Sequence, residues 1–167
     1  MKSPTQFHIE SATERDAPVI LKLIKDLAEY ERLSHEVVAT EESLRKSLFG
    51  ARRTVEVLLG YASNEPAGFA VFFHNYSTFL GRPGIYLEDL FVVPEWRRRG
   101  LGRKLLAYVA RIAVERRCGR LEWSVLDWNE PAIGFYKKLG ARAMDEWTVY
   151  RVTGEKLAQL ASEAETD

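Results

Sequence analysis

The most restrictive feature of this chain is an apolar strand that leads through a cationic turn into a helix opened by glycines. Residues 85–93 are the most strand-like stretch, and Pro94 ends them. Gly100 and Gly102 then open a helix with apolar residues at helical spacing: Leu101, Leu105, Val109 and Ile112. A helix N-terminus presents unpaired N–H groups and partial positive charge, and glycine lets a phosphate approach the backbone. The segment therefore predicts a pyrophosphate site.

Cationic side chains reinforce this prediction, and the spacing excludes two common nucleotide motifs. The turn and the first helical turn carry Arg97, Arg98, Arg99, Arg103 and Lys104. A P-loop needs Gly-Lys-Ser/Thr, and a Rossmann fingerprint needs a third glycine where Leu105 stands. One alternative is an exposed basic turn that only starts a helix. Another is an RNA-binding patch, which the balance of 24 basic and 24 acidic residues disfavours.

Hydrophobic periodicity predicts strands and helices on both sides of this turn. The expected strands are residues 7–12, 54–59, 68–73, 85–93, 121–126 and 144–152. The expected helices are residues 14–32, one capped by Thr40, one opened by Gly100, one capped by Asn129, and residues 155–163. This order predicts a single α/β domain over residues 1–167, with its core at about 6–160. Its sheet is expected to be mixed and mostly antiparallel, with helices on both faces.

Composition restricts the partners and the location. Cys118 is the only cysteine, so an intrachain disulfide is impossible. No apolar run approaches the length of a membrane span, and residues 1–10 lack the apolar stretch of a secretory signal. The three histidines, His8, His35 and His74, are scattered, so no metal site is expected. We expect a cytoplasmic protein with no nucleic-acid or membrane partner.

Two motifs resemble the signatures of the GNAT superfamily of N-acetyltransferases. The first is Arg97-x-x-Gly100-x-Gly102 between strand and helix, and the second is residues 129–140, which read Asn-x-x-Ala-x-x-Phe-Tyr-x-x-x-Gly. Residues 27–31, 86–89 and 128–131 are similar to the diamine (spermidine/spermine) acetyltransferase family. Residues 33–34, 76–78, 81–82 and 125–129 are more similar to its thialysine N-epsilon-acetyltransferase branch. The similarity covers about residues 6–160.

Two positions bear on the choice between the branches. Ser77 stands where the polyamine branch has an acidic residue, which puts a polyamine acceptor in doubt, whereas Glu130-Pro131 follows that branch. The resemblance implies direct acetyl transfer from acetyl-CoA to a primary amine of a small molecule in a ternary complex. The implied acceptors are thialysine-like amino acids first, then diamines or polyamines, and the implied assembly is a homodimer. A coenzyme-A-binding module without turnover and a protein N-acetyltransferase are the alternatives.

The resemblance also implies catalytic roles for two residues. Glu88 matches the general base, and its alternative is an edge-facing or salt-bridged carboxylate. Tyr136 matches the general acid that protonates the thiolate, and its alternative is a core aromatic. Strand alternation places Asp89 on the face opposite Glu88, where it holds the ammonium or serves as a structural carboxylate.

The remaining candidates bind the coenzyme or the amine. For the coenzyme they are the backbone of Leu90, Phe91 and Val92, residues 97–104 (Arg97, Arg98, Arg99, Gly100, Leu101, Gly102, Arg103 and Lys104), Tyr136, and Asn129, which alternatively only caps its helix. For the cationic amine they are Glu29, Glu31, Tyr76, Glu88 and Asp89, with Arg82 as a partner for an amino-acid carboxylate. The acidic residues that follow the first helix include Glu36 as well.

Overall fold

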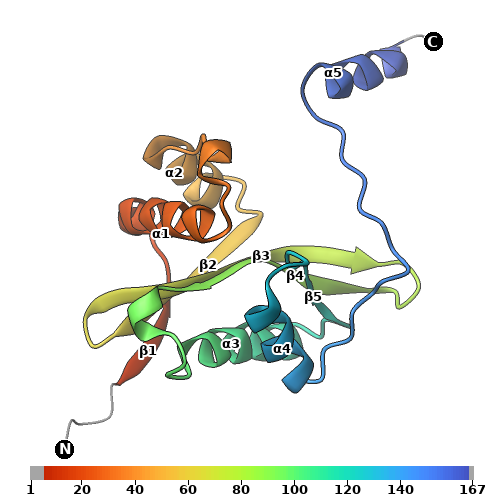
Figure 1. Cartoon of the computed structure of the whole chain (residues 1–167). Helices are drawn as coiled ribbons and strands as arrows, with labels where there is room; N and C mark the ends of the chain where they lie inside the picture. The colour runs from red at the N-terminus through yellow and green to blue at the C-terminus, as the bar shows by residue number, and fades with distance from the viewer. Residues whose placement is uncertain (1–5, 166–167) are drawn as a thin grey trace, which may run out of the picture. The chain divides into compact units, whose positions relative to one another are not determined.

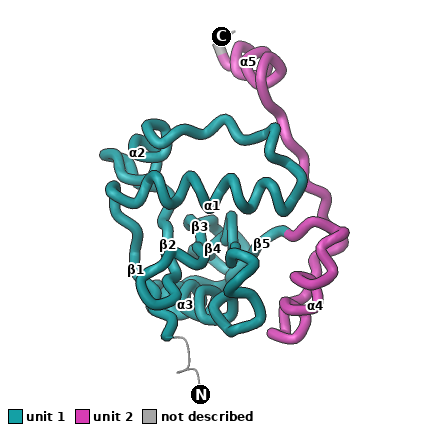
Figure 2. Tube along the Cα trace, turned by 60° about the vertical axis from the view of Figure 1, so that its left-hand side comes forward, with its two compact units in different colours: residues 1–124 teal, residues 125–167 magenta. Residues whose placement is uncertain are grey.

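A computed structural model describes residues 6–165 of the chain. The chain divides into two compact units, residues 1–124 and residues 125–167 (Figure 2). Within the described residues, no helix combines the length and the apolar character needed to cross a membrane.

The first unit is built on a five-stranded sheet. The strands are β1 Phe7–Ser11, β2 Val55–Ala62, β3 Glu65–Ser77, β4 Arg82–Val92 and β5 Leu121–Trp123. They lie in sequence order, with β1 to β4 antiparallel and β5 parallel to β4. The expected mixed, mostly antiparallel sheet is therefore confirmed. β5 is shorter than expected and ends at Trp123.

Helices cover both faces of this sheet. α1 (Ala17–Tyr30) and α2 (Glu41–Phe49) lie on one face, and α3 (Leu101–Glu115) lies on the other (Figure 1). The core between α1, α2 and the sheet consists of apolar side chains from all three: Ile20, Leu23, Leu44, Leu48, Val57, Leu59, Phe69, Val71 and Phe91. On the opposite face, Leu101, Leu105 and Val109 of α3 are fully buried. Burying apolar residues at helical spacing against a sheet is the main force that holds such layers together.

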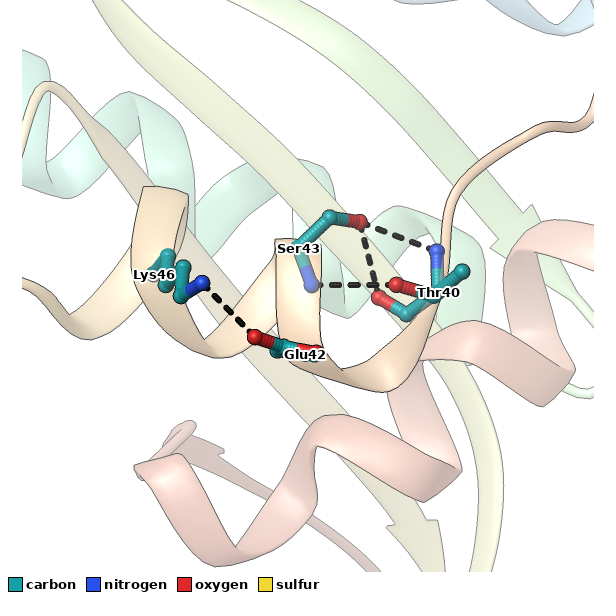
Figure 3. A network of polar contacts seen from close by, with 4 residues as sticks. All are labelled: Thr40, Glu42, Ser43 and Lys46. Carbon is teal, nitrogen blue, oxygen red and sulfur yellow. Dashed lines mark hydrogen bonds and ion pairs between the residues drawn. The ribbon is translucent and has the colours of Figure 1, made fainter.

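Local capping explains where the helices begin. The Thr40 hydroxyl accepts from the Ser43 N–H at 3.1 Å, and the Ser43 hydroxyl accepts from the Thr40 N–H at 2.9 Å (Figure 3). This reciprocal pair satisfies donors that the first turn of α2 leaves unpaired. Lys46 and Glu42 form an exposed ion pair one turn further along. The expected helix over residues 14–32 is α1 preceded by a 3₁₀ turn, Glu14–Asp16.

The second unit contains α4 (Glu130–Lys138) and α5 (Gly154–Ser162), followed by a 3₁₀ turn, Glu163–Glu165. The Asn129 side chain accepts from the Ala132 N–H at 3.3 Å, so the expected cap of α4 is confirmed. The expected strand over residues 144–152 is wrong, because none of these residues joins a sheet. Trp147, Val149 and Tyr150 are 74%, 81% and 91% exposed. Alternating apolar residues favour a strand, but a strand forms only where a neighbour pairs with it.

Candidate active site

A β-bulge at Glu88 is the central feature of the site. Val71 of β3 pairs with Asp89, and the next β3 residue, Phe72, pairs with Leu87. Glu88 is therefore an extra residue on β4 with no partner on β3. Glu88 is exposed, and no ion pair to it is found among residues 6–165. Bulges of this kind re-aim side chains and often lie beside active sites.

The bulge also changes which neighbouring strand, β3 or β5, the backbone N–H groups of β4 point toward. The Ile85 N–H donates to the Arg120 carbonyl, on the β5 side, at 3.0 Å. The Val93 N–H donates to the Ala67 carbonyl, on the β3 side, at 2.9 Å. In a regular strand, residues an even number apart direct their N–H groups to the same edge. Past the bulge, alternation from Val93 therefore directs the Leu90 and Val92 N–H groups away from β3.

That edge of β4 is open. β5 pairs with β4 only from Ile85 to Leu87, so residues 88–92 have no described strand on this side. The N–H groups of Leu90 and Val92 thus face an unpaired edge, whereas Phe91 faces its partner Phe69 on β3. An open edge of this kind accepts an extended ligand that pairs with the backbone. It also provides fixed donors for a developing oxyanion.

The segment after β4 delivers the N-terminus of α3 to the end of this edge. Pro94–Trp96 forms a 3₁₀ turn, and Gly100 is the N-cap of α3. Arg98 and Gly100 have φ angles of 59° and 95°, in the left-handed region. Gly100 provides no side-chain cap, so its helix keeps unpaired N–H donors and positive partial charge at its first turn. This geometry fits a diphosphate.

The cationic side chains of the loop divide into two groups. Arg97 turns back and donates from Nε to the Val92 carbonyl at 2.8 Å, and Lys104 donates to the Phe7 carbonyl. The Arg99 guanidinium lies 4.9 Å from the centre of the Trp96 ring. Arg98 and Arg103 are exposed, with no partner recorded among the described residues. Arg98 and Arg103 are therefore the cations best placed to meet an anion.

A pocket of about 320 Å³ lies between the end of α1, the following loop and β4. Its wall is mainly apolar, and its three ionisable residues are all acidic: Glu31, Glu36 and Asp89. An apolar pocket with only carboxylates favours a cationic ligand that has a hydrocarbon part. A second cavity, of about 300 Å³, contains Glu56, but that carboxylate is already paired with Arg116.

Asp89 has the most perturbed carboxyl group in this pocket. Burial, and after it the nearby charges of Glu88 and Glu31, together raise its pKa from 3.8 to about 6. Burial also raises the pKa of Glu31. Strand alternation alone predicted that Asp89 faces away from Glu88, but the bulge interrupts that alternation between them. The charge of Glu88 therefore acts on the neighbouring Asp89 carboxyl at the point where β4 and β5 separate.

Three sequence candidates lie apart from this pocket within the first unit. Arg82 is six residues before Glu88 on β4, roughly 20 Å along an extended strand. Tyr76 pairs with Pro83 at the same remote end and is 60% exposed. Glu29 is exposed on α1 and does not line the pocket. The structure brings Glu31, Glu88 and Asp89 together and leaves these three apart.

The candidates of the second unit lie on or next to α4. Asn129 is buried and caps the helix, which is the alternative that the sequence left open beside a coenzyme contact. Tyr136 is half-buried near the end of α4, and its ring centre lies 5.3 Å from that of Phe135.

Comparison with known proteins identifies the family. Residues 21–141 match the model of the acetyltransferase (GNAT) family. The chain belongs to the GNAT acetyltransferase family. It is 40% identical over 164 residues to thialysine N-epsilon-acetyltransferase of Bos taurus, an alignment that covers 92% of this chain and 96% of that protein. It is 37% identical over 197 residues to L-ornithine N5-acetyltransferase of Arabidopsis thaliana, covering 91% and 86%.

A solved structure shares this fold. An integron cassette protein from the mobile metagenome of V. cholerae superposes with a TM-score of 0.78 at 26% identity, covering 93% of this chain and 97% of that one. The GNAT chain is therefore an N-acetyltransferase with acetyl-CoA as its co-substrate. Among the residues that the structure describes, no group of three His, Cys, Asp or Glu side chains is arranged to hold a metal ion.

Sequence reasoning missed two features of this GNAT site. The first is the bulge, which directs Leu90 and Val92 rather than Phe91 to the open edge. The second is the direction of the Arg97 side chain, which was expected to contact the phosphates but donates to the Val92 carbonyl. The arginine itself gave no signal that would separate these two uses. In contrast, the acidic residues around the end of α1 already form a cluster in the amino-acid sequence.

Proposed function

We propose that this GNAT enzyme acetylates the primary amine of a small cationic molecule, a thialysine-like amino acid or a diamine or polyamine, in a ternary complex. One observation carries the proposal. A pocket whose only ionisable groups are Glu31, Glu36 and Asp89 shares β4 with an open backbone edge. The named relatives act on thialysine and ornithine, both of which present a side-chain amine.

The coenzyme is assigned to the open edge and the α3 N-terminus. The Leu90 and Val92 backbone suits the extended arm of the coenzyme, and the first turn of α3 suits its diphosphate. Arg98, Arg99 and Arg103 add positive charge at that turn. Gly100 keeps the approach free of a side chain. Acetyl-CoA supplies the thioester at this edge.

The acidic pocket is assigned to the amine. An alkyl ammonium has a pKa of about 10.4 and is therefore protonated near neutrality. Carboxylates attract that cation, and one of them must then accept a proton before nitrogen can attack the thioester carbonyl. Glu88 is the proposed base, directly or through a water molecule. Asp89 holds the ammonium and, with its raised pKa, is a second acceptor for the proton.

Two further groups complete the proposed reaction. The Leu90 and Val92 N–H groups stabilise the oxyanion that forms when the amine attacks the thioester carbon. The Tyr136 phenol donates a proton to the departing thiolate. A phenol with a pKa of about 10 can serve as this donor, because the thiol it regenerates has a pKa of about 8.5. This role for Tyr136 is supported by the match of residues 129–140 to the family signature.

A kinetic panel tests the acceptor. Purified full-length protein is mixed with acetyl-CoA and thialysine, lysine, ornithine, putrescine or spermidine, and free thiol release is followed. We expect kcat/KM for at least one of these amines to exceed that for acetylated thialysine, whose amine is blocked, by more than about 100-fold. Binding of coenzyme A with no amine-dependent thiol release would reduce the protein to a binding module.

We also infer that the enzyme is a cytoplasmic homodimer. The segment from Met144 to Val152 presents exposed apolar side chains, including Trp147 and Val149, without burying them in its own unit. A second copy is the partner that the family resemblance implies. Sedimentation equilibrium of the wild type and of Trp147→Asp tests the dimer. A wild-type mass of one chain at micromolar concentration would contradict it.

A further inference from the structure

Arg97 stands first in the phosphate-loop motif, yet its side chain is directed back toward β4. Its Nε donates to the Val92 carbonyl at 2.8 Å, and its own N–H donates to the Pro94 carbonyl at 3.2 Å. These two bonds close the segment from Val92 to Arg97 around the 3₁₀ turn. The side chain thereby fixes the path of the chain between the open edge and the α3 N-terminus.

The guanidinium group also contacts two aromatic rings from different elements. Its central carbon lies 4.5 Å from the centre of the Tyr30 ring and 5.3 Å from that of the Phe91 ring. Tyr30 is the last residue of α1, and Phe91 is buried in the core beneath α1. A cation over an aromatic face is attracted by the ring, and a cation at a helix C-terminus is also favoured by the helix dipole.

These contacts connect the two halves of the proposed site. Glu31, which lines the acidic pocket, follows Tyr30 directly, and Asp89 of the same pocket is two residues before Phe91. One side chain therefore contacts the last residue of α1, which precedes Glu31, and the end of β4, which carries Asp89. The same side chain holds the carbonyl of Val92, whose N–H faces the open edge.

We propose that Arg97 is a positioning residue that couples the coenzyme loop to the amine pocket, rather than a ligand of the phosphates. This inference rests on the proposed function. With the loop ordered around a diphosphate, the Arg97–Tyr30 contact fixes the end of α1 and so the position of Glu31. Amine and coenzyme then bind cooperatively. Linkage makes the effect reciprocal, and couplings between two sites are typically about 5- to 150-fold.

Three full-length variants distinguish positioning from phosphate binding. Arg97→Gln removes the cation from the aromatic rings, and Arg98→Gln removes an exposed cation from the same loop. Tyr30→Leu removes the ring but leaves every cation of the loop in place. Isothermal titration measures coenzyme A binding at several salt concentrations, and thialysine binding with and without saturating coenzyme A. If thialysine proves a poor acceptor, the panel amine with the highest kcat/KM replaces it.

We expect the wild type to bind the amine at least about fivefold more tightly when coenzyme A is present. Tyr30→Leu and Arg97→Gln should both bring that ratio close to one. Arg98→Gln should weaken coenzyme A binding and lower its salt dependence, while the ratio stays at the wild-type value. Thermal unfolding of each variant checks that it is folded, and Tyr30→Leu carries the test by itself if Arg97→Gln is unfolded.

Two results would overturn the proposal. The first is a wild-type ratio near one. The second is an unchanged ratio in Tyr30→Leu. If Arg97→Gln also loses coenzyme affinity and salt dependence as Arg98→Gln does, Arg97 binds the phosphates. Failure of the proposed function would look different, because the wild type would then not bind coenzyme A or would release no thiol with any amine.

Discussion

Asp89 on β4 and Glu31 after α1 line the same pocket, and the negative charge of Glu31 helps to raise the pKa of the Asp89 carboxyl. Burial is the larger cause, and together with Glu88 these effects move that pKa from 3.8 to about 6. A carboxyl whose pKa is raised by folding holds its proton more tightly in the folded state. Its stabilising contribution is complete below about pH 4 and is lost as the pH rises through about 6.

Asp89→Asn should therefore stabilise the ligand-free protein at neutral pH. The raised pKa corresponds to roughly 3 kcal/mol of unfolding free energy lost between pH 4 and pH 7, and part of this should return in the variant. Urea unfolding at half-unit pH steps measures the effect. The wild type should lose stability relative to Asp89→Asn as pH increases over this range. Glu65→Gln, at an exposed carboxyl on β3, is the control. Parallel stability curves for wild type and Asp89→Asn would contradict the prediction.

The bulge predicts different kinetic roles for its two carboxylates. Asp89 attracts the ammonium only when it is ionised, so its pKa of about 6 should give kcat/KM an acid limb near pH 6. Asp89→Asn should abolish this limb and raise the KM for the amine. Glu88→Gln should keep the limb but lower kcat by about 10²- to 10⁴-fold. Initial rates from pH 5 to 9 with the best panel amine distinguish the two. A small kcat change in Glu88→Gln would transfer the base role to Asp89.

Local signals allowed much of this fold to be predicted from the sequence. Thr40 and Asn129 have side-chain oxygens that cap a following helix, and both caps form as expected. The apolar spacing from Leu101 to Ile112 places α3, and Gly100 marks its start. These features depend on residues within one or two turns of each other, which is the range over which sequence patterns determine structure.

Other features depend on distant parts of the chain and left no local signal. The bulge at Glu88 depends on the register with β3. Leu87 and Leu90 flank the Glu88-Asp89 pair, so the sequence pattern does not show where the extra residue lies. Arg97 bonds to the Val92 carbonyl and also lies over the ring of Tyr30, which is far away in sequence. Residues 144–152 have the alternation of a strand, but pairing depends on a neighbour that their own unit lacks.

Gly100 provides a test of the phosphate loop. Its φ of 95° is a conformation that side-chain-bearing residues rarely adopt, although a Cβ there would meet nothing within 4 Å. Gly100→Ala should therefore lose about 1–2 kcal/mol of unfolding free energy from backbone strain and weaken coenzyme A binding. Gly102→Ala is the matched control, because its Cβ would meet Val92 at an ordinary 3.6 Å. Urea unfolding and titration calorimetry measure both. Equal stability of the two variants would show that the left-handed turn is not required.

Substitution of Tyr136 tests the general-acid role proposed for this residue of the second unit. Phe at this position keeps the ring next to Phe135 on α4 but has no proton to give to the thiolate. Tyr136→Phe should therefore lower kcat by roughly 10²-fold, while the dissociation constant of coenzyme A changes less than about threefold. Tyr108→Phe is the control, because Tyr108 on α3 carries a phenol beneath the Arg111 guanidinium, outside the proposed site.

A more acidic thiol leaves without protonation, so a thioester of such a thiol should recover much of the rate that Tyr136→Phe loses. Unchanged turnover with acetyl-CoA would leave Tyr136 as a packing residue, whereas equal loss of rate with both thioesters would assign it to binding or orientation.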